Sequence, residues 1–234
     1  MKLSIVVPCY NEAENIPLIL QRFSEIVDSR EIEVILVNNG SYDNSEEVFK
    51  AELPMYPFAK KVNVEVNQGY GYGILQGLKS AEGVYVGWTH ADMQTDPKDI
   101  AIAYDFLKEN DFAEKFFVKG RRKGRSLFDA FFTTGMSVFE TLYLGAKLFD
   151  INAQPNIFSR SFFDSWKTPP NDFALDLYAC FLAAKQGLTV KRFDVQFPKR
   201  IYGQSHWNTG IGAKFKFIRR TIAFSRNLKR RGIS

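Results

Sequence analysis

The sequence has little of what secreted, zinc-binding or membrane-spanning proteins usually carry. Only two cysteines occur in 234 residues, Cys9 and Cys180, and their wide separation indicates neither a disulfide framework nor a zinc site. No uncharged run reaches the roughly 20 residues that cross a bilayer, because the best candidate, 127–149, contains three charged residues. The first apolar run, 3–7, is too short for a signal peptide and stops at Pro8. We therefore expect a soluble or peripheral protein that folds in a reducing compartment.

Acidic residues are missing from the last part of the chain. Residues 211–234 hold eight basic and no acidic residues, whereas the rest, with 23 basic and 26 acidic residues, is mildly acidic. Apolar residues recur in this segment at helical spacing, at Ile211, Phe215, Ile218 and Ile222. The pattern is typical of a basic amphipathic helix that lies on an anionic membrane surface, which we expect over 211–231. Nucleic acid is not the favoured partner, because the segment has no aromatic–basic recognition module.

Internal repeats and low-complexity linkers are also absent, and strands instead alternate with helices. Apolar runs that predict strands lie at 3–7, 33–37, 62–66 and 84–88, and helical spacing follows them. This alternation predicts βαβ units, and therefore an α/β fold with a mostly parallel sheet. Further helices are expected at 100–107 and 173–185, and further strands at 156–160 and 189–197. We expect one domain over 1–205, followed by a basic amphipathic tail over 206–234.

Three polar residues end the fourth apolar run. His90, Asp92 and Gln94 alternate with Ala91 and Met93, so they would point to one side if the strand continued through them. Open α/β sheets bind their ligands at the carboxyl ends of strands. The segment therefore predicts a binding site at this edge of the sheet.

Four short motifs occur in a suggestive order: VVPCYNE at 6–12, LVNNGS at 36–41, NQGYG at 67–71 and ADMQTDP at 91–97. Together they resemble the ordered signature of family 2 glycosyltransferases with the GT-A fold, and within that family the branch around dolichyl-phosphate mannosyltransferase. The resemblance covers about residues 3–205. It implies the transfer of a sugar, with inversion, from a nucleotide sugar. Such an enzyme must hold the base and ribose, neutralise the leaving diphosphate and admit a nucleophile.

The resemblance assigns one set of residues to the nucleotide sugar: Pro8, Tyr10, Glu12, Asn38, Asn39, Gly69, Gly71, Ala91 and Asp92. The family commonly has Asp-Asp where this chain has Asn38 and Asn39, and asparagine can still accept a hydrogen bond from a base N–H. A turn is the alternative for the asparagines. For Glu12 the alternative is a first-turn position favoured by the helix dipole. Gly69 and Gly71 would let the backbone pass close to the donor.

The metal motif also departs from the family pattern. In the family an Asp-x-Asp binds a divalent cation, whereas here His90 replaces the first Asp, Asp92 matches the second and Gln94 follows. The loss of one carboxylate weakens Mg²⁺ binding, and imidazole suits Mn²⁺ somewhat better. The resemblance thus implies Mn²⁺ or Mg²⁺ on Asp92, Gln94 and His90. A hydrogen-bonded structural histidine is the alternative for His90.

Cationic residues beyond the fourth strand are assigned to phosphate. A basic loop carries Arg121, Arg122 and Arg125, which in the resembling branch meet the acceptor phosphate, although such loops are also typical of solvated surface. Arg200 and Ser205 match an Arg-x-x-Gly-x-Ser pattern at the end of the family's domain. The resemblance places Arg200 against the donor diphosphate or the acceptor phosphate, with Ser205 nearby.

Two acidic residues are candidates for a general base. Asp172 and Asp176 are four residues apart on a predicted helix, so they should share one face. By the resemblance, one of them would deprotonate a hydroxyl acceptor. Asp172 is equally well placed to be an N-terminal helix carboxylate. A phosphate acceptor is already ionised and needs no base.

The basic tail and the arginines favour a lipid-linked or polyprenyl-phosphate acceptor, a UDP- or GDP-sugar donor, and peripheral attachment at the cytoplasmic face of a membrane. Two alternatives stay open. One is a transferase that acts on a saccharide hydroxyl; the other is a nucleotide-sugar-binding partner subunit without catalysis, since His90, Asn38 and Asn39 replace acidic residues. The Phe-rich segment 127–149 is either core or a lipid groove. The sequence does not indicate an oligomeric state.

Overall fold

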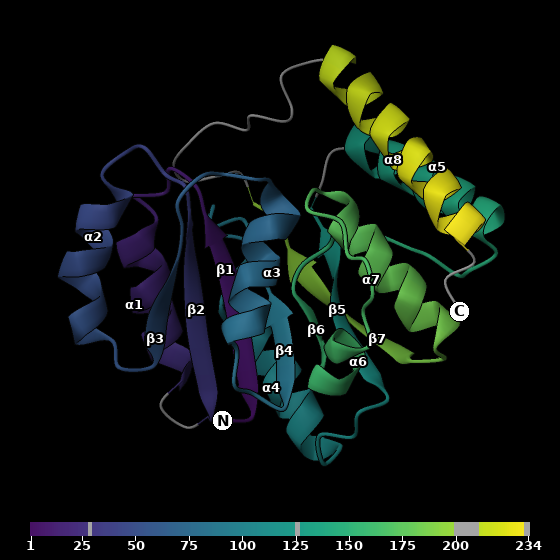
Figure 1. Cartoon of the computed structure of the whole chain (residues 1–234). Coiled ribbons are helices and arrows are strands. Elements are labelled where there is room, and N and C mark those ends of the chain that lie inside the picture. The colour runs from purple at the N-terminus through teal and green to yellow at the C-terminus, as the bar shows by residue number, and fades with distance from the viewer. Residues whose placement is uncertain (28–29, 125–126, 199–210, 232–234) are drawn as a thin grey trace.

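The structure is a computed structural model that describes residues 1–27, 30–124, 127–198 and 211–231. Within this part of the chain, seven strands form one sheet in the order β3-β2-β1-β4-β6-β5-β7 (Figure 1). The strands are β1 Leu3–Cys9, β2 Ile32–Asn39, β3 Ala59–Val64, β4 Tyr85–Trp88, β5 Phe116–Lys123, β6 Asn156–Ser159 and β7 Thr189–Gln196. β6 runs antiparallel to both of its neighbours, and the other pairings are parallel. The predicted α/β class with a mostly parallel sheet is confirmed.

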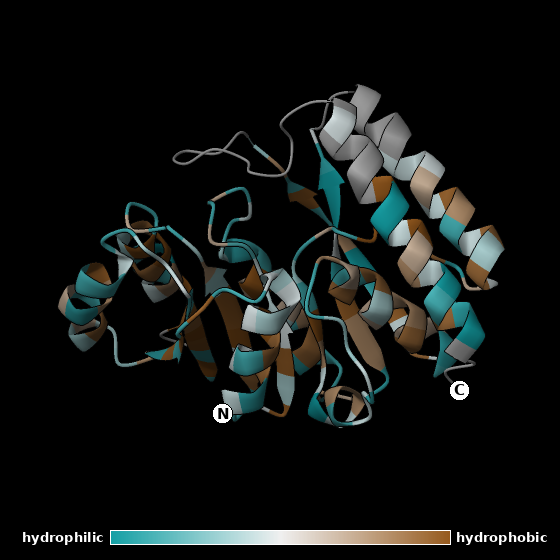
Figure 2. Ribbon diagram, turned by 45° about the horizontal axis from the view of Figure 1, so that its top comes forward, coloured by the Kyte–Doolittle hydropathy of each residue, from teal (hydrophilic) through white to brown (hydrophobic). Residues whose placement is uncertain are grey.

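Helices cover both faces of this sheet. They are α1 Ile16–Val27, α2 Ser45–Glu52, α3 Tyr70–Ser80, α4 Lys98–Glu109, α5 Leu127–Leu144, α6 Arg160–Asp164, α7 Ala174–Lys185 and α8 Ile211–Arg231, with a short 3-10 helix, η1 Leu53–Met55. Successive strand residues face opposite cores: Val6 and Ile35 pack with α3 and α7, whereas Ile5 and Leu36 pack with α1 and α4. Figure 2 shows the hydrophobic strands enclosed between these helices.

Three neighbouring parallel strands end at one edge of the sheet. Cys9 on β1 lies opposite Asn38 on β2, and Val6 lies opposite Trp88, the last residue of β4. The loops that follow these strands therefore gather side by side. On its other side Trp88 lies opposite Asn156, the first residue of β6. The sheet edge at which the sequence predicts a binding site thus exists, and β6 extends this edge towards β5.

The expectation that a strand continues through the polar cluster is wrong. β4 ends at Trp88, and the residues after it form a bent loop in which Met93 has φ of 58°. His90, Asp92 and Gln94 therefore do not share one side of a strand. Their positions depend on the hydrogen bonds of this loop and not on strand alternation.

Two further local expectations are also wrong. The basic segment expected as a loop belongs to β5 as far as Lys123, because it pairs in parallel with β7. Asp172 precedes α7 and is exposed, while Asp176 lies in the first turn of α7 and is 2% exposed. The two carboxylates therefore do not share a helix face.

α8 packs along α5 at one end of the molecule (Figure 1). The hydroxyl of Ser225 donates to Glu140 Oε2 at 2.6 Å, Leu228 is buried, and Lys229 Nζ lies 4.6 Å from the centroid of the Tyr143 ring. These contacts fix α8 against α5. None of the helices in the described part of the chain has both the length and the apolar character needed to cross a membrane.

Part of the Phe-rich segment faces outward. On α5, Val138, Phe139 and Leu142 are exposed, whereas Ser137 and Glu140 are buried. α5 therefore presents an apolar strip to the outside while two of its polar residues are internal. On α8, the side chains of Arg219, Arg220, Arg226, Lys229 and Arg230 are exposed.

Candidate functional site

The turn after β4 holds one buried carboxylate. Asp92 is 6% exposed, and its Oδ1 accepts a hydrogen bond from the backbone N–H of Gln94 at 3.1 Å. The hydroxyls of Thr89 and Thr95 lie 2.9 Å apart and close the loop on itself. These bonds account for the bend that ends the strand. They hold Asp92 at the carboxyl edge of the sheet, as the sequence predicts.

Aromatic rings adjoin this turn. The Tyr70 ring, at the start of α3, lies 6.1 Å from the half-buried His90 ring and stacks on Phe173 at 4.6 Å with 5° between the planes. Burial, and then the nearby Asp176 carboxylate, hold the pKa of Tyr70 well above its ordinary value. The sequence interpretation assigns no role to Tyr70 or Phe173, although Tyr70 lies within the motif NQGYG and Phe173 follows Asp172.

Gln94 ties the turn to the end of β7. Its Nε2 donates to the backbone oxygen of Pro198 at 3.0 Å. The segment that follows contains Arg200 and Ser205, which lie outside the described residues, as does Arg125. The described part of the chain thus brings Pro198, which precedes Arg200 by two residues in the sequence, next to the Asp92 turn.

The residues of the turn fit a divalent cation that is shared with a substrate. Among the described residues, no three His, Cys, Asp or Glu side chains gather into a metal-binding group. Mg²⁺ sites commonly use one or two protein carboxylates together with substrate phosphates. Asp92 supplies one carboxylate, and the His90 imidazole is a ligand that Mn²⁺ accepts. The donor set therefore suits a cation whose remaining ligands come from a diphosphate.

Hydrogen bonds join the loops that follow β1 and β2. The backbone N–H groups of Asn11 and Glu12 donate to the hydroxyls of Ser41 and Ser45 at 3.0 and 3.2 Å. In return, Asn11 Oδ1 accepts from the N–H of Tyr42 at 3.0 Å. These bonds fix two of the motifs against each other.

The side chains proposed for the base and ribose lie on or beside these loops. Tyr10 is exposed, and its ring lies 5.9 Å from that of Tyr42, edge to face. Pro8 is half-buried, and Glu12 Oε2 accepts from Asn15 Nδ2 at 2.5 Å. The rings of Tyr10 and Tyr42 thus lie on two loops that hydrogen bonds hold together, at the place where the motifs predict the nucleotide.

The paired asparagines make structural contacts. Asn38 Oδ1 accepts from the N–H of Ser41 at 3.2 Å, and its Nδ2 donates to Glu46 Oε2 at 3.1 Å. Asn39 Nδ2 donates to the oxygen of Gly69 at 3.1 Å, and its Oδ1 is buried without a partner among the described residues. Asn38 therefore takes part in a turn, as the alternative interpretation proposes, and a carbonyl oxygen has a second lone pair for a ligand.

Two glycines let another loop approach α3. A Cβ on Gly71 would lie 2.6 Å from the oxygen of Pro170 and 2.7 Å from that of Asp172, and one on Gly69 would lie 2.4 Å from the oxygen of Asn171. Gly69 also has φ of 117°, which favours glycine. The neighbour of these glycines in the structure is thus the loop that carries Asp172.

Hydrogen bonds fix this loop at both of its ends. The N–H of Tyr72 donates to the oxygen of Asn171 at 2.9 Å, and Asp172 Oδ1 accepts from the N–H of Ala174 at 3.0 Å. Asp172 is exposed and sits beside the Tyr70–Phe173 stack. Its carboxylate is therefore accessible from solvent.

Asp176 lies in a buried polar network instead. Its Oδ1 accepts from Gln154 Nε2 at 3.0 Å and from Asn156 Nδ2 at 2.9 Å. Burial raises the pKa of Asp176, and Lys119 and His90 oppose that rise. Sequence reasoning misses Gln154, Asn156 and Lys119, because no motif contains them; the only signal is Asn156, a polar residue at the start of the predicted strand 156–160.

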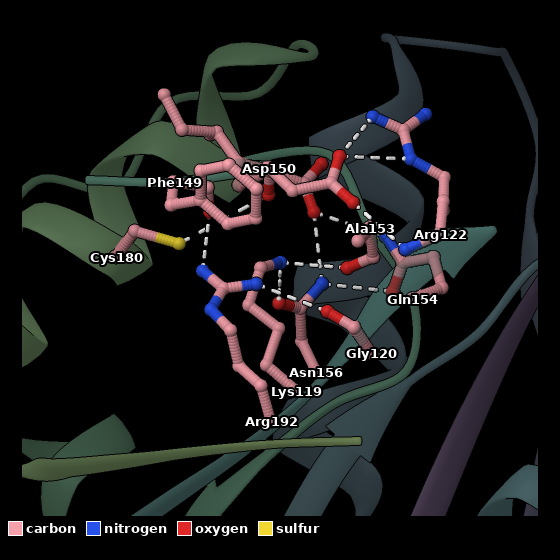
Figure 3. Close-up of polar contacts among 12 residues, drawn as sticks. Lys119, Gly120, Arg122, Phe149, Asp150, Ala153, Gln154, Asn156, Cys180 and Arg192 are labelled. Carbon is pink, nitrogen blue, oxygen red and sulfur yellow. Dashed lines mark hydrogen bonds and ion pairs between the residues drawn. The ribbon is translucent and has the colours of Figure 1, made fainter. Parts of the chain in front are cut away.

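The arginines of β5 are ion-paired. Arg122 donates through its backbone N–H to Asp150 Oδ2 at 2.9 Å and through Nε and Nη2 to Asp150 Oδ1 at 3.0 and 2.5 Å (Figure 3). Arg121 pairs with Asp194 on the neighbouring strand β7, and both side chains are exposed. Any phosphate bound by these arginines would share them with the carboxylates.

A comparison with family models decides the family. The model described as glycosyl transferase family 2 matches residues 4–164. The chain belongs to glycosyltransferase family 2. The motifs, the sheet edge on which they meet and this match agree, so the expected membership of family 2 is confirmed.

Relatives in the family share part of this chain. An undecaprenyl-phosphate 4-deoxy-4-formamido-L-arabinose transferase of Aeromonas hydrophila subsp. hydrophila is 35% identical over 102 residues, which are 42% of this chain and 31% of that protein. The uncharacterized glycosyltransferase YkcC of Bacillus subtilis is 32% identical over 130 residues, 55% of this chain and 40% of that protein. The chain thus spans about a third to two fifths of the curated relatives that it matches.

Solved structures confirm the GT-A fold. Glucosyl-3-phosphoglycerate synthase from Mycobacterium tuberculosis, solved with Mn²⁺, UDP and glucosyl-3-phosphoglycerate, matches with a TM-score of 0.70 at 19% identity, over 100% of this chain and 81% of that one. The mannosyltransferase PcManGT from Pyrobaculum calidifontis, solved with GDP-Man and Mn²⁺, matches with a TM-score of 0.65 at 20% identity, over 86% of this chain and 58% of that one.

Proposed function

We propose that this chain transfers a sugar from a UDP- or GDP-sugar to the phosphate of a polyprenyl-type lipid, with inversion at the transferred carbon. The observation that carries the proposal is the turn after β4, which holds Asp92 at the sheet edge where the motif loops meet. Relatives named as undecaprenyl-phosphate transferases support a lipid phosphate as the acceptor. Solved structures of the same fold that contain UDP or GDP-Man support the class of donor.

The donor would lie across the loops after β1, β2 and β4. Tyr10 and Asn38 would contact the base, Pro8, Glu12 and Asn39 would line its pocket, and Gly69, Gly71 and Ala91 would flank the sugar. Asp92, with His90 and Gln94 as further candidates, would hold Mn²⁺ or Mg²⁺. That cation would neutralise the charge that develops on the leaving diphosphate.

An acceptor phosphate would react without a general base. One of its ionised oxygens forms a bond to the anomeric carbon from the face opposite the diphosphate, while the bond between that carbon and the diphosphate oxygen breaks. Guanidinium groups bind phosphate well. Arg121, Arg122 and Arg200 are candidates for this contact, with Arg125 and Ser205 beside them in the sequence.

The end of the molecule formed by α5 and α8 would face the membrane. Exposed cations on α8 suit an anionic leaflet, and the exposed strip of Val138, Phe139 and Leu142 on α5 suits its apolar layer. We propose a peripheral enzyme at the cytoplasmic face, with residues 1–205 as catalytic domain and 206–234 as basic tail. The boundary between these parts lies outside the described residues.

The test is a transfer assay with a panel of UDP- and GDP-sugars, undecaprenyl phosphate in vesicles, and Mn²⁺ or Mg²⁺. Mass spectrometry should detect the glycosylated lipid with the wild type. Asp92→Ala should lower the rate by about 10²-fold or more, as loss of one transition-state contact does. Asp164→Ala, which removes an exposed carboxylate at the end of α6, should not lower it. Full activity of Asp92→Ala would refute the assignment of the cation.

One observation favours a second candidate function, transfer to a saccharide hydroxyl. Asp172 is exposed beside the Tyr70–Phe173 stack, where a general base for a hydroxyl would be useful. Parallel assays with sugar acceptors distinguish the two, because Asp172→Ala should abolish transfer to a hydroxyl but spare transfer to a phosphate. Donor binding without any turnover would instead indicate a binding subunit.

A further inference from the structure

Lys119 has an unusual environment for a lysine. Its side chain is fully buried on β5, and its Nζ donates to the oxygen of Ala153 at 2.6 Å and to Asn156 Oδ1 (Figure 3). A buried ammonium is costly unless an opposite charge and hydrogen bonds compensate it. No motif of the family resemblance includes this lysine, so its burial needs a reason within the structure.

Asp176 is the buried carboxylate connected to it. Asn156 accepts from Lys119 through Oδ1 and donates to Asp176 Oδ1 through Nδ2 at 2.9 Å, so one amide bridges the two charges. The same Nδ2 donates to Gln154 Oε1 at 2.8 Å, and Gln154 Nε2 donates to Asp176 Oδ1 at 3.0 Å. The two amides and two charges form one connected network.

Other charged groups nearby have partners of their own. Those that face Lys119 are Asp176, Asp150, Arg192 and the Cys180 thiol, and those that face Asp176 are Lys119 and His90. Asp150 is paired with Arg122 at 2.5 Å. Arg192 donates to the oxygen of Gly120 at 3.0 Å and to that of Phe149. Asp176 is therefore the carboxylate to which the Lys119 network is directly bonded.

The network reaches the candidate site through Gln154. Its Nε2 also donates to the Tyr70 hydroxyl at 3.2 Å. Tyr70 lies 6.1 Å from His90 and stacks on Phe173, which follows Asp172 in the chain. A shift of Gln154 would thus move the ring that contacts both His90, in the turn after β4, and Phe173, beside Asp172.

We propose that Lys119 and Asp176 act as one positioning unit, whose opposite charges together hold Gln154, Tyr70 and the loop 170–172 in place. In this assignment Asp176 is not the general base, and Lys119 is a further residue on which the reaction depends. The effect on sugar transfer rests on the proposed function; the effect on the loop does not.

The test compares Lys119→Met, Asp176→Asn and the double variant. Each single change leaves one buried charge unpaired, so the melting temperature should fall by roughly 6 °C or more, and transfer should fall by about 10-fold or more. The double variant is neutral and should regain at least half of both losses. Lys123→Met, on the same strand with its ammonium 3.7 Å from Asp194 and exposed, is the matched control and should change neither quantity.

Two further measurements separate this account from its rivals. The rate of amide hydrogen exchange over 69–73, where the N–H of Tyr72 donates to Asn171, should rise in both single variants and return to the wild-type rate in the double variant. This result does not depend on whether the protein is enzymatically active. The pH profile of transfer in the double variant should match that of the wild type. Additive losses in the double variant, or unchanged exchange, would overturn the proposal. An Asp176 that acts as a base would keep the double variant as inactive as Asp176→Asn.

Discussion

Gly71 offers the sharpest prediction about how the site is built. In Gly71→Ala the new Cβ would lie 2.6 Å from the oxygen of Pro170 and 2.7 Å from that of Asp172, both of which are backbone atoms. Ordinary contact begins at 3.4 Å, so the loop 170–172 must retreat by roughly 0.8 Å. The substitution therefore displaces the loop that carries Asp172 without touching its side chain.

Stability and activity should respond differently to this change. Overpacking costs about 1–3 kcal/mol, whereas alanine in place of glycine inside a helix gains about 1 kcal/mol. The net loss is then at most roughly 2 kcal/mol, or a melting temperature lower by no more than about 8 °C. A misplacement of about 1 Å in an active site can cost about 10²-fold in rate. Gly71 is itself proposed to flank the donor sugar, so we expect a folded enzyme with about 100-fold slower transfer.

Gly135→Ala is the matched control. Gly135 is also inside a helix, and a Cβ there would meet nothing within 4 Å. This variant should be slightly more stable, with unchanged transfer. Differential scanning calorimetry and the lipid-transfer assay measure both quantities. Transfer by Gly71→Ala at the wild-type rate would refute the reasoning that α3 positions the loop.

Two other predictions concern Asp99, in the first turn of α4, and the basic tail. Burial raises the pKa of Asp99 to about 7, so the protonated carboxyl is favoured in the folded state and stability is lost as pH rises from the ordinary value, 3.8, towards 7. Asp99→Asn should therefore raise the melting temperature at pH 8, and this gain should shrink as the pH falls to 4. An equal gain in melting temperature at pH 8 and pH 4 would contradict the prediction. Replacing the exposed Arg219, Arg220 and Arg226 by Gln should weaken binding to anionic vesicles by roughly 100-fold, because each charge contributes about 1 kcal/mol. Binding to neutral vesicles should not change. Unchanged sedimentation with anionic vesicles would contradict it.

Much of the fold is predictable because the local patterns are strong. The apolar runs that become β1, β2 and β4 are short and bounded by turn residues, the run at 62–66 overlaps only the end of β3, and the alternation of these runs with helices predicts the parallel sheet. The direction of β6 is not predictable in this way. It has only four residues, and its antiparallel pairing with β4 and β5 depends on tertiary contacts.

The site is only partly predictable for a similar reason. The position of Asp92 follows from the end of an apolar run, and the turn that holds it depends on side chains such as Thr89 and Thr95. Spacing alone puts Asp172 and Asp176 on one face, but the helix begins at Ala174 and separates them. Lys119 is also beyond sequence reasoning, because a lysine in a basic run is expected at the surface.

The measurement that tests the central claim most directly is isothermal titration calorimetry of UDP and GDP, each with and without Mn²⁺. The account predicts that one of these nucleotides binds the wild type and that Mn²⁺ tightens its binding. In Asp92→Asn the effect of Mn²⁺ should be lost, while Asp164→Asn should retain it. Nucleotide binding that Mn²⁺ tightens equally in wild type and Asp92→Asn would contradict the account.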